Sequence, residues 1–423
     1  MKGTAPRRRA NHASVVEVIG FDHFKRFSGA ITVGCKDLAA TQTWGECIVC
    51  IGPCLRRFLR FPSPPSWRHR KNRLTMNSRL FLLVAMLLAG SPLRAEKIVL
   101  VAGGARDAVG IPATDAKLKE PFGVDFDRAG NLFIIEMASG NRLLKMDATG
   151  LLTHIAGTGK AGASGDGGPA LQAEFNGPHN LAVLPDGNVL IGDTWAGRVR
   201  KVDVKSGTVT SLAGYSVFAE KARSGGPYCI ALDFTGTKLF IADLTRIHEL
   251  DVATGKSRTV AGNGKKGRPE DGTLATDAPL SDPRAVAVDR KGNIYILERG
   301  GNALRVVSTD GKIKTVVNAS GAKGGTGDGG PALAATMNGP KHLCVDLDDN
   351  VIIADAESNL IRKFTPLDGR IVRVAGTGKQ GRGAVGGSPL ECALARPHGV
   401  TVHRDGTLYI TDSYNDRILR IEK

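Results

Sequence analysis

Six side chains, each directly after a proline, are the strongest candidates for chemistry in this sequence. The residues at these positions are Phe122, His179, Tyr228, Arg284, Lys341 and His398. Imidazole binds metals and moves protons, a phenol acts as an acid or base, and guanidinium and ammonium groups stabilise negative charge. If the fold brings these positions together, they form a polar rim around a binding site.

The prolines open six similar segments, which must position these side chains. Their spacings are 57, 49, 56, 57 and 57 residues. Each segment contains four short runs with β-strand character, divided by turn residues such as Asp-Gly and Gly-Asn. Four-stranded units that repeat radially make a β-propeller. We therefore predict an all-β, six-bladed β-propeller with four antiparallel strands per blade, and we expect the rim residues at one mouth of its central channel.

The two ends of the repeat region complement each other. The last segment stops after its third run, RILRIEK at 417–423, and KIVLVAG at 97–103 has the pattern of a fourth run. The strand at 97–103 is therefore predicted to join the three C-terminal strands and to close the ring. Closure removes an exposed sheet edge.

Residues 76–95 have the features of a signal peptide. A basic start at Arg79 precedes an apolar run and small residues, with a cleavage point near Ala95. The sequence thus predicts a secreted or periplasmic propeller of residues 96–423. Met76 is then the expected true start, and residues 1–75 are a mis-annotated or disordered extension. The CIVCIGPC stretch at 47–54 lacks a second ligand pair at zinc-finger spacing.

The net charge of +16 is concentrated in the N-terminal extension. Residues 1–75 hold 14 Lys and Arg against 4 Asp and Glu, whereas residues from 96 onward hold 41 against 37. A nearly neutral propeller does not favour a nucleic-acid partner. We also expect a monomer without a membrane span.

The pattern of the segments resembles the NHL repeat, most clearly in RPHGVTVHRDGTLYITDSYNDRILRIE at 396–422. The resemblance covers about 97–423, and the connector A-G-T-G-x-x-G…G-D-G-G-P-A looks like the secreted bacterial version of the family. Membership implies a six-bladed propeller that binds protein, peptide or glycan ligands through its channel mouth and inter-blade loops. A minority of the superfamily are enzymes, namely peptidyl-amidating lyase and gluconolactonase-like hydrolases.

The enzyme alternative is a metal-dependent lyase or lactonase-like hydrolase acting in the channel. The segments at 178–183 and 397–402 are similar to zinc-binding strands of peptidyl-amidating lyase, which would make His179 and His398 zinc ligands with His342 as the third candidate. Tyr228 would then be the acid or base, and Arg284 the charge stabiliser. A third Pro-His strand is missing, and channel-facing carboxylates for calcium are not evident. No cofactor is assigned, and Zn or Ca belongs to this alternative only.

An acidic residue ends the second run of every segment. These residues are Glu136, Asp193, Asp243, Glu298, Asp355 and Asp412. We predict a structural role, in which each carboxylate accepts turn amides and pairs with an arginine such as Arg198 or Arg417. Ala303 and Leu360 hold the matching place in the fourth and fifth segments, which predicts that those two segments lack the pair.

Two glycine-rich stretches, at 165–178 and 327–340, are identical at eleven of fourteen positions. A phosphate-binding loop would precede a long helix, whereas a strand run follows these stretches. We interpret them as inter-blade connectors with one short helical turn at Pro-Ala-Leu. Trp195 and Tyr414 align two residues after their acids, where they could form an aromatic platform for a sugar or peptide.

Overall fold

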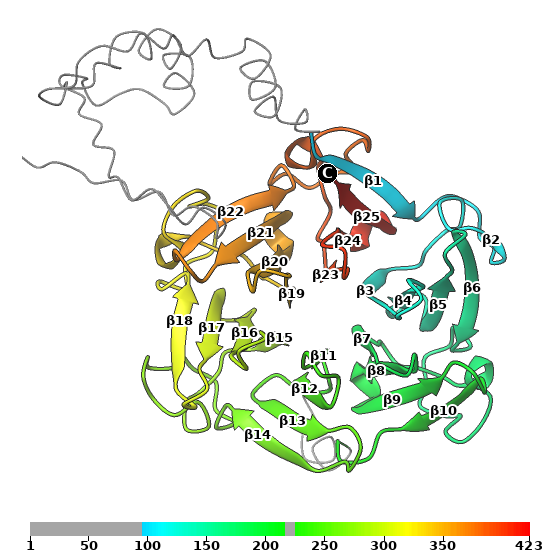
Figure 1. Ribbon diagram of the computed structural model, residues 1–423, viewed down its shortest axis with the longest axis horizontal. Coiled ribbons are helices and arrows are strands. Elements are labelled where there is room, and N and C mark those ends of the chain that lie inside the picture. The colour runs from blue at the N-terminus through cyan, green and yellow to red at the C-terminus, as the bar shows by residue number, and fades with distance from the viewer. Residues whose placement is uncertain (1–94, 216–224) are drawn as a thin grey trace, which may run out of the picture. The chain divides into compact units, whose positions relative to one another are not determined.

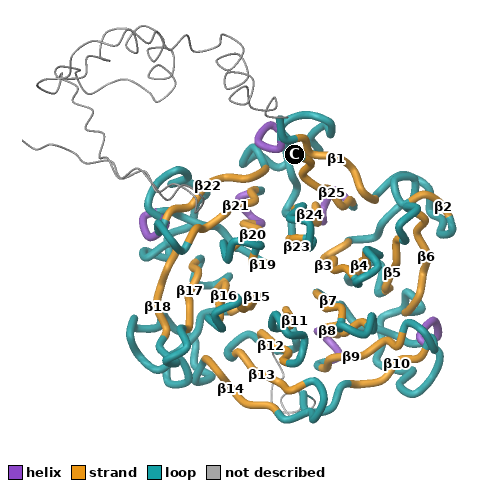
Figure 2. The backbone as a smooth tube through the Cα atoms, viewed as in Figure 1, coloured by secondary structure: helices purple, strands orange, loops and turns teal. Residues whose placement is uncertain are grey.

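The computed structural model describes residues 95–215 and 225–423, which form six β-sheets arranged as blades around a central channel (Figures 1 and 2). Blade 1 holds β2 (Ile111–Pro112), β3 (Pro121–Phe126), β4 (Leu132–Glu136), β5 (Arg142–Met146) and β6 (Leu151–Ala156). Blade 2 holds β7 (Asn180–Val183), β8 (Val189–Asp193), β9 (Arg198–Asp203) and β10 (Thr208–Ser211). Blade 3 holds β11 (Cys229–Leu232), β12 (Lys238–Ala242), β13 (Ile247–Asp251) and β14 (Ser257–Ala261).

Blade 4 holds β15 (Pro283–Val288), β16 (Ile294–Glu298), β17 (Ala303–Val307) and β18 (Ile313–Val317). Blade 5 holds β19 (His342–Val345), β20 (Val351–Asp355), β21 (Leu360–Thr365) and β22 (Arg370–Ala375). Blade 6 holds β23 (Gly399–Val402), β24 (Leu408–Asp412), β25 (Arg417–Glu422) and β1 (Lys97–Ala102). The predicted six-bladed propeller is confirmed, and blade 1 gains the two-residue strand β2 at its outer edge.

The ring closes as predicted, through β1 on the outer side of β25 (Figure 1). The pairing is antiparallel, with Lys97 opposite Glu422 and Leu100 opposite Leu419. The Ile98 N–H also donates to the Gly387 carbonyl at 2.9 Å, and the Ile98 carbonyl accepts from the Gly386 N–H at 2.7 Å. The last connector therefore covers the outer edge of β1.

Apolar side chains from the second strands fill the spaces between blades. All five residues of β4, β8, β16, β20 and β24 are buried. These strands are covered by a neighbouring blade on each face, which is why their sequences are more apolar than those of the outer strands. Six innermost strands, β3, β7, β11, β15, β19 and β23, surround the channel (Figure 1).

The glycine-rich connectors cover the outermost strands. Pro169 bridges to Thr208 of β10, and Pro331 bridges to Arg370 of β22. Directly after each proline comes a 3-10 turn, η1 (Ala170–Gln172) or η3 (Ala332–Ala334), which confirms the predicted helical turn. Four further 3-10 turns are η2 (Thr194–Ala196), η4 (Ala356–Ser358), η5 (Pro389–Glu391) and η6 (Ser413–Asn415). The connectors thus protect sheet edges that would otherwise template association.

The predicted export signal and the CIVCIGPC stretch lie outside the described residues, apart from Ala95 at the end of the predicted signal. Within 95–215 and 225–423, no helix has the length and apolar character needed to cross a membrane.

Candidate functional site

A buried carboxylate holds the start of five of the six rim-bearing segments in place. In five blades, the acid at the end of the second strand accepts a backbone N–H from the residue two positions before the blade-opening proline. The donors are Lys119, Asn176, Ser281, Asn338 and Ala395, at 2.7 to 2.8 Å. The acid therefore fixes the backbone that leads directly to the rim residue.

An arginine from the third strand compensates each of these five buried acids. Arg142 pairs with Glu136 at 2.7 Å, and Arg417 pairs with Asp412 at 2.7 Å. In blade 3 the partner is His248, 3.0 Å from Asp243. The sequence-based prediction for blades 4 and 5 was wrong. Arg305 lies 2.8 Å from Glu298, and Arg362 lies 3.5 Å from Asp355.

In blades 4 and 5 the arginine reaches the acid from a different position of the third strand. Arg305 and Arg362 stand two positions after Ala303 and Leu360, and residues two apart in a strand share a face. The arginine reaches the same acid from either position. Blade 2 uses both positions, with Arg198 at 3.6 Å and Arg200 at 3.9 Å from Asp193.

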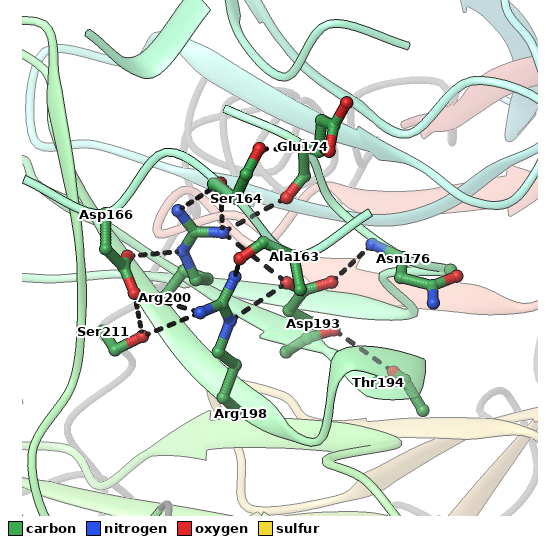
Figure 3. Close-up of polar contacts among 12 residues, drawn as sticks. Ala163, Ser164, Asp166, Glu174, Asn176, Asp193, Thr194, Arg198, Arg200 and Ser211 are labelled. Atoms are coloured by element: carbon green, nitrogen blue, oxygen red, sulfur yellow. Dashed lines mark hydrogen bonds and ion pairs between the residues drawn. The ribbon is translucent and has the colours of Figure 1, made fainter. Parts of the chain in front are cut away.

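Figure 3 shows this double pair together with Asp166 of the connector. Asp166 Oδ1 lies 2.9 Å from Nε of the fully buried Arg200. The guanidinium of Arg200 also donates to the carbonyls of Ser164 and Glu174. Asp328 of the second glycine-rich copy contacts Arg362 in the same way, at 2.9 Å. The aspartate of the glycine-rich stretch is thus a partner for a buried arginine.

All six predicted rim residues line one cavity of about 170 Å³ at the mouth of the channel, which we call the mouth pocket. Its remaining lining residues are Glu120, Met137, His342 and Tyr414. Rim residues that lie up to 276 positions apart in the chain meet here because the ring places the six strand starts around one axis. Of the residues that line this pocket, the sequence pointed only to those directly after the blade-opening prolines.

Aromatic rings contact one another along part of the rim. Phe122 stacks on His398 with ring centroids 4.1 Å apart and meets His179 edge-on at 5.3 Å. Tyr228 meets His179 at 4.9 Å, and the Arg284 guanidinium lies 4.0 Å from the centre of the Tyr228 ring. These contacts fix the orientation of the side chains before any ligand arrives.

Burial keeps both rim histidines neutral. Desolvation lowers the pKa of His179 to about 4, and it lowers the pKa of His398 well below its ordinary value. His179 Nδ1 lies 2.8 Å from the Gly177 carbonyl, so Nδ1 carries the proton and donates. Nε2 of His179 is therefore a hydrogen-bond acceptor at physiological pH.

The three histidines of the zinc alternative do not fit a metal site. His342 Nε2 lies 2.8 Å from Asn180 Nδ2, and His342 Nδ1 accepts from the Val400 N–H at 3.3 Å. Both ring nitrogens are thus engaged with protein groups. Across 95–215 and 225–423, no three His, Cys, Asp or Glu side chains lie close enough together to hold a metal ion. A zinc site needs at least three protein ligands.

The contact between Asn180 and His342 divides the channel. It joins blades 2 and 5, whose inner strands β7 and β19 face each other across the ring (Figure 1). His342 lines both the mouth pocket and a larger cavity of about 500 Å³ on the other side of this contact. The mouth pocket is therefore a shallow chamber with a floor.

Comparison with known proteins supports the fold and the repeat. The model of the NHL repeat matches residues 394–421, and the model of the teneurin NHL domain matches residues 237–326. SUPPRESSOR OF QUENCHING 1 of Arabidopsis thaliana is 26% identical over 329 residues, which are 72% of this chain and 30% of that protein. Human teneurin-1 is 24% identical over 319 residues, which are 69% of this chain and 11% of teneurin-1. The chain therefore spans less than a third of either relative.

Solved structures show the same fold at low sequence identity. A protein of unknown function from Bacteroides thetaiotaomicron superimposes with a TM-score of 0.60 and 17% identity, over 77% of this chain and 76% of that chain. An auxiliary nutrient binding protein from Bacteroides ovatus gives a TM-score of 0.58 and 15% identity, over 78% and 76% of the two chains. The chain is therefore a six-bladed β-propeller that contains NHL-type repeat sequence, matched at residues 237–326 and 394–421.

Proposed function

We propose that this protein is a binding module that captures an anionic group in its mouth pocket. The ligand is a small anion, or the anionic end of a protein, peptide or glycan chain. The observation that carries the proposal is the state of Lys341, which lines the pocket and forms no ion pair within the described residues. An unpaired ammonium group in a buried pocket favours a negatively charged partner.

The electrostatic surroundings of Lys341 strengthen this argument. Burial, followed by the charges of Arg299 and Arg284, lowers its pKa to about 8. A bound anion would offset both effects. Arg284 stands beside it in the pocket, with Nε donating to Asp282 at 2.7 Å. Two cationic donors at one side of a small chamber suit a carboxylate or a similar anion.

Replacing Lys341 with methionine is expected to weaken binding of a carboxylate ligand by about 10- to 100-fold. A hydrogen bond to a charged group contributes about 1.5–3 kcal/mol. Isothermal titration calorimetry of the full chain against acidic peptides and acidic oligosaccharides, each paired with its amidated or reduced neutral form, measures the loss. Binding to the parent should also weaken as the pH rises through about 8, because Lys341 then loses its proton. That pH step should be absent in Lys341→Met.

The matched control is Lys314→Met, which changes an exposed lysine on β18 of blade 4. It should bind like the parent, and thermal melting should show that both variants are folded. Equal affinity in Lys341→Met and the parent would remove the basis of the proposal. A stoichiometric zinc or calcium ion that disappears in His179→Ala, together with conversion of the bound compound, would establish the enzyme alternative instead.

We also propose that the propeller is exported after cleavage near Ala95. The signal-like sequence of residues 76–95 supports this. N-terminal sequencing of protein recovered outside the cytoplasm should give a start close to Glu96. Recovery of residues 1–75 on the exported chain would refute both the Met76 start and the cleavage.

A further inference from the structure

The mouth pocket has two chemically different halves, and the first is a row of rings that we call the aromatic arc. In order, the arc runs from Trp195, which contacts His179 but does not itself line the pocket, through His179, Phe122 and His398 to Tyr414. Successive ring centroids are 5.9, 5.3, 4.1 and 5.7 Å apart. The two ends are half-exposed, with 52% of Trp195 and 47% of Tyr414 accessible to solvent. A ligand in the pocket can therefore extend over either end.

Cations dominate the second half, on blades 4 to 6. Arg284 and Arg299 share one carboxylate, Asp282, at 2.7 and 3.3 Å. Arg396 pairs with Glu357. Lys341 lies among these arginines, and their charges all contribute to lowering its pKa. Two carboxylates thus face four cations around Lys341, of which Lys341 and Arg284 line the pocket itself, so this side of the pocket is positively charged.

Hydrogen-bond acceptors complete the site on the aromatic side. Nε2 of the neutral His179 accepts but cannot donate, because the proton is on Nδ1. Glu120 also lines the pocket, where one of its oxygens accepts from the Ser139 hydroxyl at 2.7 Å. These groups can accept hydrogen bonds from ligand hydroxyl groups. The pocket therefore suits a ligand that carries donors as well as an anion.

We propose that the mouth pocket binds an acidic sugar, namely a pyranose carrying a carboxylate at the end of an oligosaccharide. The inference rests on the proposed binding function and names the class of ligand. The carboxylate lies against Lys341 and Arg284, and the ring hydroxyls donate to His179 and Glu120. The apolar C–H face of the sugar lies on the arc, whose ring faces carry negative charge density. A chamber of about 170 Å³ holds an end residue, and the next sugars lie over Trp195 or Tyr414.

Two other ligand classes use less of the site. An acidic peptide end engages Lys341 and Arg284 but leaves the half-exposed faces at the ends of the arc without a partner. A nucleotide base needs an open slot between parallel rings. The parallel pair in the arc, Phe122 and His398, is closed at 4.1 Å, and Phe122 meets His179 edge-on, at 88°.

The test is calorimetry with trigalacturonate and its carboxyl-reduced counterpart, a neutral galactose trisaccharide. The full chain should bind the acidic trisaccharide at least about 10-fold more tightly, since charge-assisted hydrogen bonds are lost on reduction. Lys341→Met should abolish the preference for the acid. Trp195→Ala should weaken the binding of trigalacturonate several-fold while leaving the affinity for monomeric galacturonate unchanged. Arg373→Ala, on the exposed outer strand β22, is the control and should change neither affinity.

The outcomes separate this inference from the function on which it rests. If trigalacturonate does not bind while an acidic peptide or a nucleotide binds in a Lys341-dependent manner, the sugar assignment is wrong and the anion-binding function stands. If none of these anions binds, both the sugar assignment and the proposed anion-binding function are wrong. Equal binding of the acidic and reduced trisaccharides contradicts the inference even when the affinity is high, because the cationic half would then have no role.

Discussion

Asp166→Val is expected to destabilise the propeller by about 3 kcal/mol, and adding Arg200→Leu should recover most of that loss. Asp166 lies 2.9 Å from Nε of Arg200, whose side chain is fully buried (Figure 3). Removing one partner of a buried ion pair costs about 3–5 kcal/mol because a charge is left uncompensated. The lower value applies because 36% of the Asp166 side chain is exposed to solvent and because Asp193 still lies 3.9 Å from Arg200.

The double variant copies an arrangement that the protein already contains. In blade 6 the positions equivalent to Asp166 and Arg200 are Val385 and Leu419, and in blade 1 they are Val109 and Leu144. Leu419 and Leu144 are fully buried. Replacing a buried ion pair by apolar residues of similar volume is often neutral. The double variant should therefore lie within about 1 kcal/mol of the parent.

Urea denaturation followed by circular dichroism measures all three variants. Asp193 keeps Arg198 at 3.6 Å throughout, so no carboxylate is stranded in the double variant. The double-mutant cycle formed by the two single variants and the double variant should yield a coupling energy of about 2 kcal/mol or more if Asp166 and Arg200 act as a unit. Additive effects of the two substitutions would show that Asp166 and Arg200 stabilise the blade independently.

Arg362→Leu is expected to cost about 3–5 kcal/mol at pH 8 and less at pH 5. Asp355 is fully buried, and Arg362 is its cation, with Leu360 at the other available position. Burial raises the pKa of Asp355, while the Asn338 N–H and Arg362 lower it. Without Arg362 the pKa rises further. Removing one partner of a buried ion pair costs about 3–5 kcal/mol of stability.

The sign of the pH effect follows from the raised pKa. The folded state holds a proton that the unfolded carboxyl group, with a pKa of about 3.9, has already lost. Stability is therefore retained at low pH and lost as the pH rises through the folded-state pKa. Because Asp355 of the parent already has a pKa of about 7, the deficit of Arg362→Leu should shrink by up to about 1.4 kcal/mol on going from pH 8 to pH 7 and stay nearly constant from pH 7 to pH 5. The lost bonds to Asp328 and Thr326 leave a pH-independent remainder.

Arg200→Leu is the matched control, because Arg198 still compensates Asp193 in blade 2. Its cost should be smaller and should vary less between pH 5 and 8 than that of Arg362→Leu, because Arg198 continues to lower the pKa of Asp193. A rescue variant adds Leu360→Arg and Asp328→Val to Arg362→Leu, which gives blade 5 the pattern of blade 6. Recovery of stability at pH 8 is the expected result. A pH-independent loss in Arg362→Leu would mean that Asp355 does not depend on this arginine.

The buried acid–arginine pairs show which contacts could be predicted from the sequence and which could not. The six acids were evident because they end apolar runs at fixed places. Their partners in blades 4 and 5 were missed because one spacing was assumed for all blades. The internal repeat held the missing signal: Asp166, Asp271 and Asp328 accompany Arg200, Arg305 and Arg362, whereas Val109 and Val385 accompany leucines. Blade 3 continues the pattern with Tyr215 and His248, whose rings lie 6.4 Å apart.

The sequence by itself determined the number of blades, the strand pattern and the closing strand. These features follow from local periodicity and from a repeat that is complete only when its two ends join. It also placed the rim residues at equivalent positions. The tertiary structure decided what those residues do together, because Phe122 and His398 stack only when ring closure makes blades 1 and 6 neighbours. The division of the mouth into aromatic and cationic halves, the neutrality of the histidines and the unpaired Lys341 all depend on burial and on contacts between blades. Such contacts join positions far apart in the chain, and local sequence patterns do not encode them.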